Sequence, residues 1–169
     1  MKYRLLIFEI AGFIFVSVVG TLLHFAYEYF DYSTVAAVIS PINESTWEHL
    51  KLLFFPFLFY TLFEYLVIGK KYNNFIYYKA ISVLIGLFTI LAVFYLYTGI
   101  IGRSFVIVDI MLFYFSVFIT YQNSYRLIKQ NPIYKNYNNI GAFIFLLLIG
   151  LFVSFTFAPP AINLFQPPI

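Results

Sequence analysis

The sequence contains no cysteine, only two histidines, and few charged residues, which make up 10% of its 169 positions. Without cysteine the chain has no disulfide, no thiolate metal ligand and no catalytic thiol. The net charge of +3 is small and scattered, so it does not indicate nucleic-acid binding. Nucleotide-binding loops, a GxSxG elbow and an HExxH helix are also missing from the sequence, which argues against the enzyme classes that they define.

Apolar residues dominate instead: 63% of the chain is hydrophobic, 24% is aromatic, and the mean hydropathy is +0.89. A soluble domain of this size could not hide so much apolar surface from water. The sequence therefore predicts an all-α integral membrane protein. Its richness in Phe, Ile, Tyr and Asn is typical of AT-rich bacterial genomes, so we expect it in a bacterial cytoplasmic membrane.

Five segments are long and apolar enough to cross a bilayer, which takes about 20 residues of helix. They are residues 5–27, 46–68, 80–101, 105–125 and 140–157. Residues 32–42 are apolar but too short to cross, so they predict a re-entrant or interfacial segment. The proline-rich tail, residues 158–169, predicts an extended segment on the outer surface. One membrane domain, residues 1–169, accounts for the whole chain.

The distribution of basic residues predicts the orientation, because cytoplasmic flanks accumulate Lys and Arg. If the helices alternate, only Lys51 and Arg103 fall toward the outside. All the others fall on the opposite side: Lys2, Arg4, Lys70, Lys71, Lys79, Arg126, Lys129 and Lys135. The N-terminus is therefore expected in the cytoplasm and the C-terminus outside.

Polar residues share one face on three of the predicted helices when they are projected at about 100° per residue. Because ionisable groups are costly in lipid, these faces should turn inward. Glu9 and Glu64 lie on two of them, toward the cytoplasmic side, where we expect each to be protonated or bonded to hydroxyl groups. The fifth helix is nearly all apolar and is expected to face lipid.

The most unusual segment is SPINESTWEHLKL, residues 40–52, at the outer entrance to the second helix. Ser45 and Glu48 form an S-x-x-E capping box, which satisfies free amides at a helix N-terminus. A cap does not explain why Asn43, Trp47 and His49 lie in the same short stretch beside a bilayer. This concentration of polar groups favours a functional site.

The segment resembles the S-P-x-N-E-S-x-W-E-H signature of a family of small, uncharacterised bacterial multi-pass membrane proteins, a domain of unknown function. This resemblance implies the helix count but no activity. Ser45 and His49 are also similar, in part, to the Ser-x3-His element of the ceramidase and progestin-receptor superfamily of membrane hydrolases. Those proteins bind zinc with three histidines, whereas this chain has two.

His24 and His49 lie near the outer ends of two antiparallel helices, so their side chains could meet. Zinc accepts two imidazoles and a carboxylate, with an open position for water in a catalytic site. We predict Asp109 as the third ligand, with Glu28, Glu44 and Glu48 as alternatives. Two histidines can also be structural, hydrogen-bonded groups.

These residues predict an outward-facing polar pocket formed by the ends of the first, second and fourth helices and the segment 32–42. The predicted catalytic residues are Glu48, His49 and Ser45, and the predicted metal ligands are His24, His49 and Asp109. Five further residues are predicted to bind substrate: Asn43, Glu44, Trp47, Glu28 and Lys51. We expect a metal-assisted hydrolase or transferase acting on a lipid or lipid-linked substrate. The alternatives are a solute-binding or transport component and a non-catalytic subunit of a membrane complex.

Overall fold

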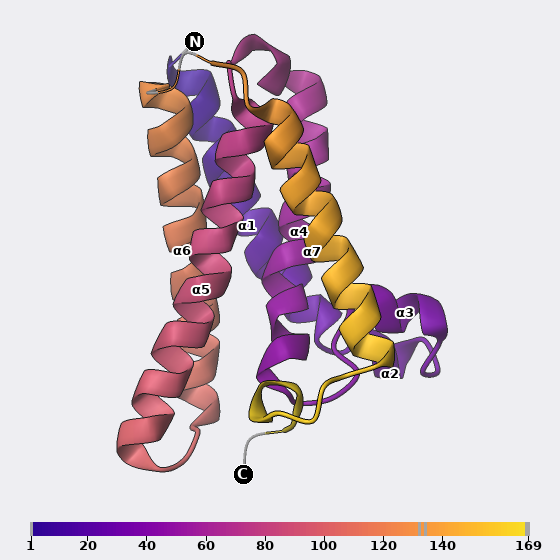
Figure 1. Ribbon diagram of the computed structural model, residues 1–169. Coiled ribbons are helices and arrows are strands. Elements are labelled where there is room, and N and C mark those ends of the chain that lie inside the picture. Colours follow the sequence, from indigo (N-terminus) through magenta and orange to yellow (C-terminus); the bar gives the residue numbers. More distant parts are fainter. Residues whose placement is uncertain (1, 132, 134, 168–169) are drawn as a thin grey trace.

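The computed structural model describes residues 2–131, 133 and 135–167, and this part of the chain contains helices and no strands (Figure 1). Five long helices form the bundle: α1 Lys2–Leu23, α4 Thr46–Val67, α5 Phe75–Ile101, α6 Val106–Gln130 and α7 Asn138–Phe157. Four short elements connect or follow them: α2 Ala26–Tyr29, α3 Thr34–Ile39, η1 Gly69–Lys71 and η2 Asn163–Phe165.

The five long helices are each long and apolar enough to span a membrane, with mean hydropathies between 1.4 and 2.6 in their most apolar windows. This confirms the predicted all-α fold class. One boundary differs in a way that matters: α5 begins at Phe75, whereas the sequence predicted residue 80. Lys79 therefore lies inside the helix and is fully buried, whereas the predicted boundary had left it in the loop before the helix. A charge ended the apolar run in the sequence, but the folded bundle supplies counter-charges for it.

Helix α4 is the centre of the bundle. Two-thirds of its most apolar window (67%) is buried, against 28–39% for the other four helices. It packs against α1 and α5, while α6 packs against both α1 and α5, and α7 lies along α5. Large apolar side chains such as Leu66, Phe88 and Val106 remain exposed on the outside, as expected of helices that face lipid. Helix α7 is not purely lipid-facing, because Phe145 and Phe152 belong to the core.

Small residues allow two close helix contacts. Pro56 lies inside α4, and a proline leaves the carbonyl four residues earlier without its helical partner. That carbonyl belongs to Leu52, and Gly20 of α1 packs against it: a Cβ at Gly20 would lie 2.5 Å from the Leu52 oxygen. Gly86 of α5 packs directly against the Thr120 side chain of α6.

The predicted interfacial segment forms the short helix α3, which Ser33 caps by accepting a hydrogen bond from the Ala36 amide. Ala36 and Ala37 are buried, whereas Val35 is exposed. The predicted tail folds back over the same end of the bundle, opposite the N-terminus, and Phe165 in η2 is buried there (Figure 1). Residues 168–169 of that predicted tail lie outside the described residues.

Replacing Gly86 by alanine should destabilise the bundle, because the new Cβ overlaps the Thr120 side chain and forces α5 and α6 apart. Overpacking of this kind typically costs about 1–3 kcal/mol. Thermal unfolding of the purified chain in detergent, followed by circular dichroism, measures the loss. Gly99→Ala, on the same helix with nothing within 4 Å of the added Cβ, is the matched control. Equal melting temperatures for the two variants would contradict the close contact.

Candidate functional site

The segment before α4 is held by its own polar side chains. Ser45 caps α4 by accepting a hydrogen bond from the Glu48 amide, as the predicted capping box requires. In a full capping box the Glu side chain would accept a hydrogen bond from the Ser45 amide. Here the Glu48 carboxylate accepts one from the Ile42 amide instead, at 3.0 Å. The Ser45 amide donates to the Asn43 side chain instead, at 2.9 Å. Both amides are satisfied, and the turn between α3 and α4 is fixed.

Glu48 and Lys51 form a buried ion pair, called here the buried pair, with 2.6 Å between the Lys51 Nζ and the Glu48 Oε2. The Lys51 ammonium is 0% exposed and also donates to the carbonyls of Ala37 and Ser40. The second Glu48 oxygen accepts a hydrogen bond from Thr156 of α7. The buried pair thus connects α3, α4 and α7, and a substrate could reach either charge only by displacing these bonds.

Trp47 has a packing role at the same place. Its ring lies 4.9 Å from that of Phe152 in α7 and 5.1 Å from that of Phe165 in η2, measured between centroids. The tail is therefore held against the first turn of α4. Of the motif residues predicted to be functional, Ser45, Trp47, Glu48 and Lys51 all stabilise this end of the bundle.

Replacing Lys51 by methionine should destabilise the chain strongly, because it leaves the Glu48 charge buried without a partner. Removing one member of a buried pair typically costs about 3–5 kcal/mol. The double variant Glu48→Gln/Lys51→Met removes both charges and should recover much of that loss. Unfolding in detergent compares the three proteins, and a single variant as stable as the unaltered chain would refute the role of the pair.

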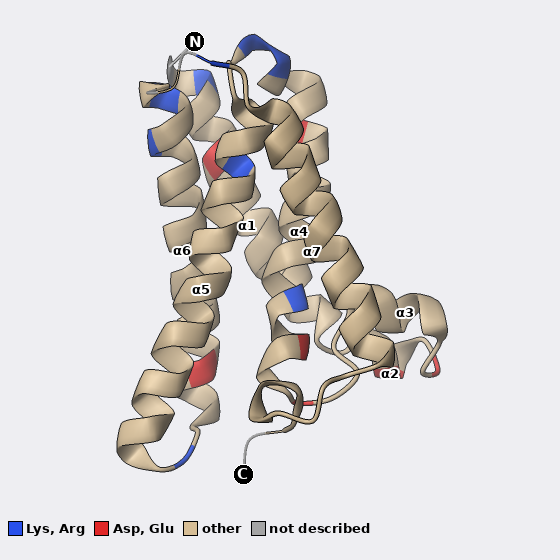
Figure 2. Cartoon of the chain, in the orientation of Figure 1, with Lys and Arg blue, Asp and Glu red and all other residues tan. Residues whose placement is uncertain are grey.

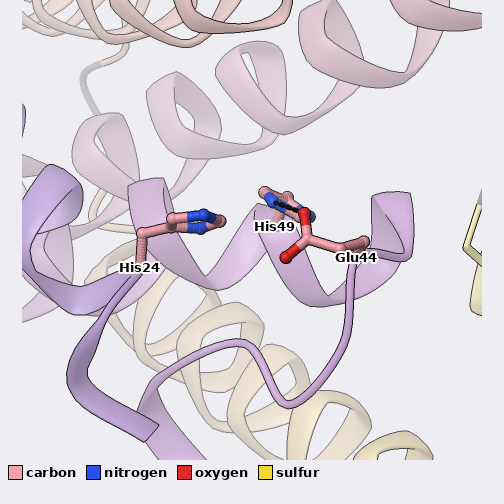
Figure 3. A group of neighbouring side chains, drawn as sticks. All are labelled: His24, Glu44 and His49. Atoms are coloured by element: carbon pink, nitrogen blue, oxygen red, sulfur yellow. Dashed lines mark ion pairs between the residues drawn. The ribbon is translucent and has the colours of Figure 1, made fainter. Parts of the chain in front are cut away.

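His24, Glu44 and His49 come together at this end of the bundle and are called here the histidine group (Figure 3). His24 directly follows α1, Glu44 lies in the turn before α4, and His49 lies in the first turns of α4. One ligand atom from each residue lies within 4.8 Å of those of the other two. The imidazole centroids are 5.2 Å apart, and the His49 Nε2 lies 3.4 Å from the Glu44 Oε2.

Hydrogen bonding leaves one nitrogen of His49 free. Its Nδ1 lies 2.9 Å from the Ser45 carbonyl oxygen, so the ring donates its Nδ1 proton there and directs Nε2 toward Glu44. Metal-binding histidines commonly have this arrangement, in which the second nitrogen donates to a carbonyl or carboxylate. The capping turn therefore orients His49 as well as starting the helix.

The surroundings of His24 favour the neutral form of its imidazole ring. Partial burial lowers the pKa of His24, and the neighbouring His49 lowers it further, while Glu44 raises it. Its Nδ1 is buried and has no hydrogen-bond partner among the described residues. A neutral imidazole with a free lone pair is the form that binds a metal.

The donor set of the histidine group suits a divalent metal such as zinc, which accepts two imidazole nitrogens and a carboxylate oxygen. The third donor is Glu44, which was predicted to bind substrate, and not Asp109. Asp109 lies on α6 and accepts a hydrogen bond from Tyr97 of α5. Glu28 is exposed on α2 and is likewise outside the group. The histidine group is therefore built from the residue that follows α1, the turn before α4 and α4 itself, without the fourth long helix.

A second charged cluster lies at the opposite end, where α1, α4 and α5 meet; Figure 2 shows acidic and basic positions inside the bundle at two levels. The Lys79 Nζ lies 3.0 Å from the Glu9 Oε1 and 2.6 Å from the Glu64 Oε2. Ser124 of α6 also donates to Glu9, at 2.7 Å. We call Glu9, Glu64 and Lys79 the triad. Both acids were predicted to lie on inward faces, but their lysine partner was not predicted.

The helical bundle and its charges define a multi-pass, membrane-like protein with polar groups gathered inside it and at one end. The chain belongs to the family of unknown function DUF6512, whose model matches residues 3–169. The expectation of an uncharacterised domain-of-unknown-function family is thereby confirmed. Neither the curated proteins nor the solved structures contained a match to this chain. The likeness to the ceramidase and progestin-receptor superfamily stays a prediction based on Ser45 and His49.

Proposed function

We propose that the histidine group binds a divalent metal ion, zinc by its donor chemistry, and that the chain is a metal-dependent hydrolase or transferase for a lipid or lipid-linked substrate. The convergence of His24, Glu44 and His49 carries this proposal. His24 follows α1, whereas Glu44 and His49 lie at the start of α4, and nothing in helix packing alone requires two imidazoles and a carboxylate to point at one place. Zinc supplies Lewis acidity and lowers the pKa of a coordinated water.

The position of the group supports a substrate at the membrane surface. The Glu44 side chain is 70% exposed and that of His49 is 30% exposed, so the centre opens to the outside of the bundle. Most described basic residues lie at the other end (Figure 2). By the positive-inside rule we place the histidine group on the outer face of a bacterial cytoplasmic membrane, with the N-terminus inside.

The roles of the motif residues follow from their burial. We assign His24, Glu44 and His49 as ligands, and Asn43 and Glu28, which are both exposed, as substrate contacts. Ser45 and Glu48 become positioning residues, because they fix the turn that presents Glu44 and His49. A catalytic role for Glu48, as predicted from the sequence, would require this side chain to leave the buried pair.

Purified protein should bind one Zn²⁺ per chain, because three donors converge at a single point. His24→Gln and His49→Gln should each weaken binding by more than the roughly 10- to 100-fold that changes outside the ligand shell cause. Isothermal titration with Zn²⁺, with visible absorption of Co²⁺ as a check on ligand number, measures the effect. Asp109→Asn is the matched control, since it removes the carboxylate that sequence reasoning predicted, and it should bind like the unaltered chain.

The same variants test the enzymatic role. Vesicles of phosphatidylglycerol and phosphatidylethanolamine containing the Zn²⁺-loaded protein should release fatty acid or headgroup. Release should stop with a chelator and with the histidine variants, but continue with Asp109→Asn. Equal metal binding by the histidine variants and the unaltered chain would overturn the metal centre. Tight binding without any lipid turnover would leave a metal site and overturn the hydrolase.

A transport role is the second candidate, favoured by the position of two charged groups at different depths. The histidine group lies at one end of the bundle and the triad near the other, and a transport path needs polar groups at both levels. Proteoliposomes should then take up Zn²⁺ into a lumen containing a fluorescent chelator, more slowly with Glu9→Gln or Glu64→Gln. Uptake unchanged by both substitutions would argue against transport.

A further inference from the structure

The triad is as deeply buried as any part of the bundle. Glu9 is 3% exposed, while Glu64 and Lys79 are 0% exposed. Glu64 is about one helical turn from the end of α4, and Lys79 about one turn from the start of α5. The cluster is thus sealed by protein but close to the N-terminal end of the bundle.

The charges of the triad do not balance. The buried pair has one carboxylate and one ammonium, whereas the triad has two carboxylates and one ammonium. If both acids are ionised, one negative charge remains buried inside the bundle, where an uncompensated charge is strongly unfavourable. The unmatched charge requires one further cation.

Free atoms for that cation are present. The Glu9 Oε2 and the Glu64 Oε1 are buried and have no hydrogen-bond partner among the described residues. The same is true of the Tyr121 hydroxyl, although the ring of this residue lies beneath the Lys79 ammonium at 5.2 Å. In the buried pair, by contrast, both Glu48 oxygens are bonded.

Neither acid has a second cation paired with it among the described residues. The Lys79 ammonium is surrounded by the rings of Phe57, Phe75 and Tyr121, at 5.2 to 5.6 Å from their centroids. The titratable and charged groups that face the cluster or its neighbour Tyr72 are Arg4 and Glu9 from α1, Tyr60 and Glu64 from α4, Lys79 from α5, Tyr121 from α6 and Tyr72 after η1. Of the two cations in this set, Lys79 forms ion pairs with both acids, whereas Arg4 forms none with either.

We propose that the triad binds one exchangeable proton, held by a carboxyl oxygen that Lys79 leaves free. On binding, hydronium transfers its proton to the carboxylate, an O–H bond forms, and one water molecule is released. The cluster then contains one carboxylic acid, one carboxylate and one ammonium, and its net charge is zero. The proton is favoured over a metal ion because Lys79 already occupies the space between the two acids.

A hollow lies at the N-terminal end of the bundle, on the side of the triad. Tyr72 lines this open hollow of about 500 Å³, together with Lys71 and Lys129. Burial raises the pKa of the Tyr72 phenol, and the charge of Glu64 raises it further, while Arg4 lowers it. Tyr72 therefore lies within electrostatic reach of the triad, and exchange of the proposed proton with water is expected at this end of the bundle.

Infrared difference spectroscopy of the purified protein, titrated with pH in detergent, tests this proton. A protonated carboxyl band that shifts in D2O should appear, and Glu9→Gln and Glu64→Gln should each remove it, because either leaves a neutral one-to-one pair. Asp109→Asn, which removes a carboxyl group of α6 outside the triad, is the matched control and should keep the band. A chelator keeps the histidine group free of metal, so the result does not depend on the metal centre.

Counting protons provides a second measurement. Potentiometric titration of the folded chain from about pH 6 upward, where an ordinary Glu carboxyl has already lost its proton, should release one proton more per molecule than titration of Glu64→Gln over the same range, and the fold of the variant is checked by circular dichroism. If that variant does not fold, the band and its D2O shift in the unaltered protein still decide. Absence of a protonated carboxyl band at every pH, a band that survives both triad substitutions, or Na⁺ binding in place of a proton would overturn the proposal.

Discussion

Compensation of buried charge is the constraint on which the rest of this bundle depends. The charged side chains between the helices are buried by protein, so each ionised group there needs a partner that compensates its charge. Lys51 finds one on its own helix, three residues earlier, and Lys79 finds two on other helices. These partners determine which faces of α1, α4, α5 and α7 meet. The apolar side chains fill the remaining space between the helices, and they specify which helix faces meet less narrowly than the charged groups do.

The motif before α4 both anchors the turn to the bundle and holds Glu44 and His49 near His24. Its buried residues attach the turn to α3, α7 and the tail, and its exposed residues face the surface beside His24. Such a division explains why the motif contains more polar groups than a helix cap needs. A catalytic or binding group must be held by neighbours that are themselves fixed, and here the neighbours lie in the same twelve or so residues, as a compact motif allows.

Much of the fold could be predicted because it depends on local properties. Hydrophobic length identified the five spanning helices, and the S-x-x-E pattern identified the start of α4 at Ser45. The approach of His24 to His49 followed from antiparallel helices of similar length. Each of these predictions needed only helix geometry and sequence separation.

The missed features depend on contacts between distant residues. Lys79 was treated as the flank of a helix because a charge ended the apolar run, and its bond to Glu9 joins residues 70 positions apart. Glu9 and Glu64, two acids in apolar segments without an assigned partner, could have indicated a buried lysine, since each would need a cation. Glu44 replaced Asp109 because the turn before α4 folds toward His49, and a helical projection does not describe turns.

Trp47 has a consequence for how this protein can be observed. It is the only tryptophan of the chain, and it lies two residues before His49, in contact with the tail and α7. Indole emission responds to polarity and to nearby quenchers such as imidazolium and paramagnetic ions. The molecule therefore carries an intrinsic fluorophore at the end of the bundle that contains the histidine group. Changes in tryptophan emission can report loosening of the tail or occupation of the neighbouring imidazoles without an attached dye.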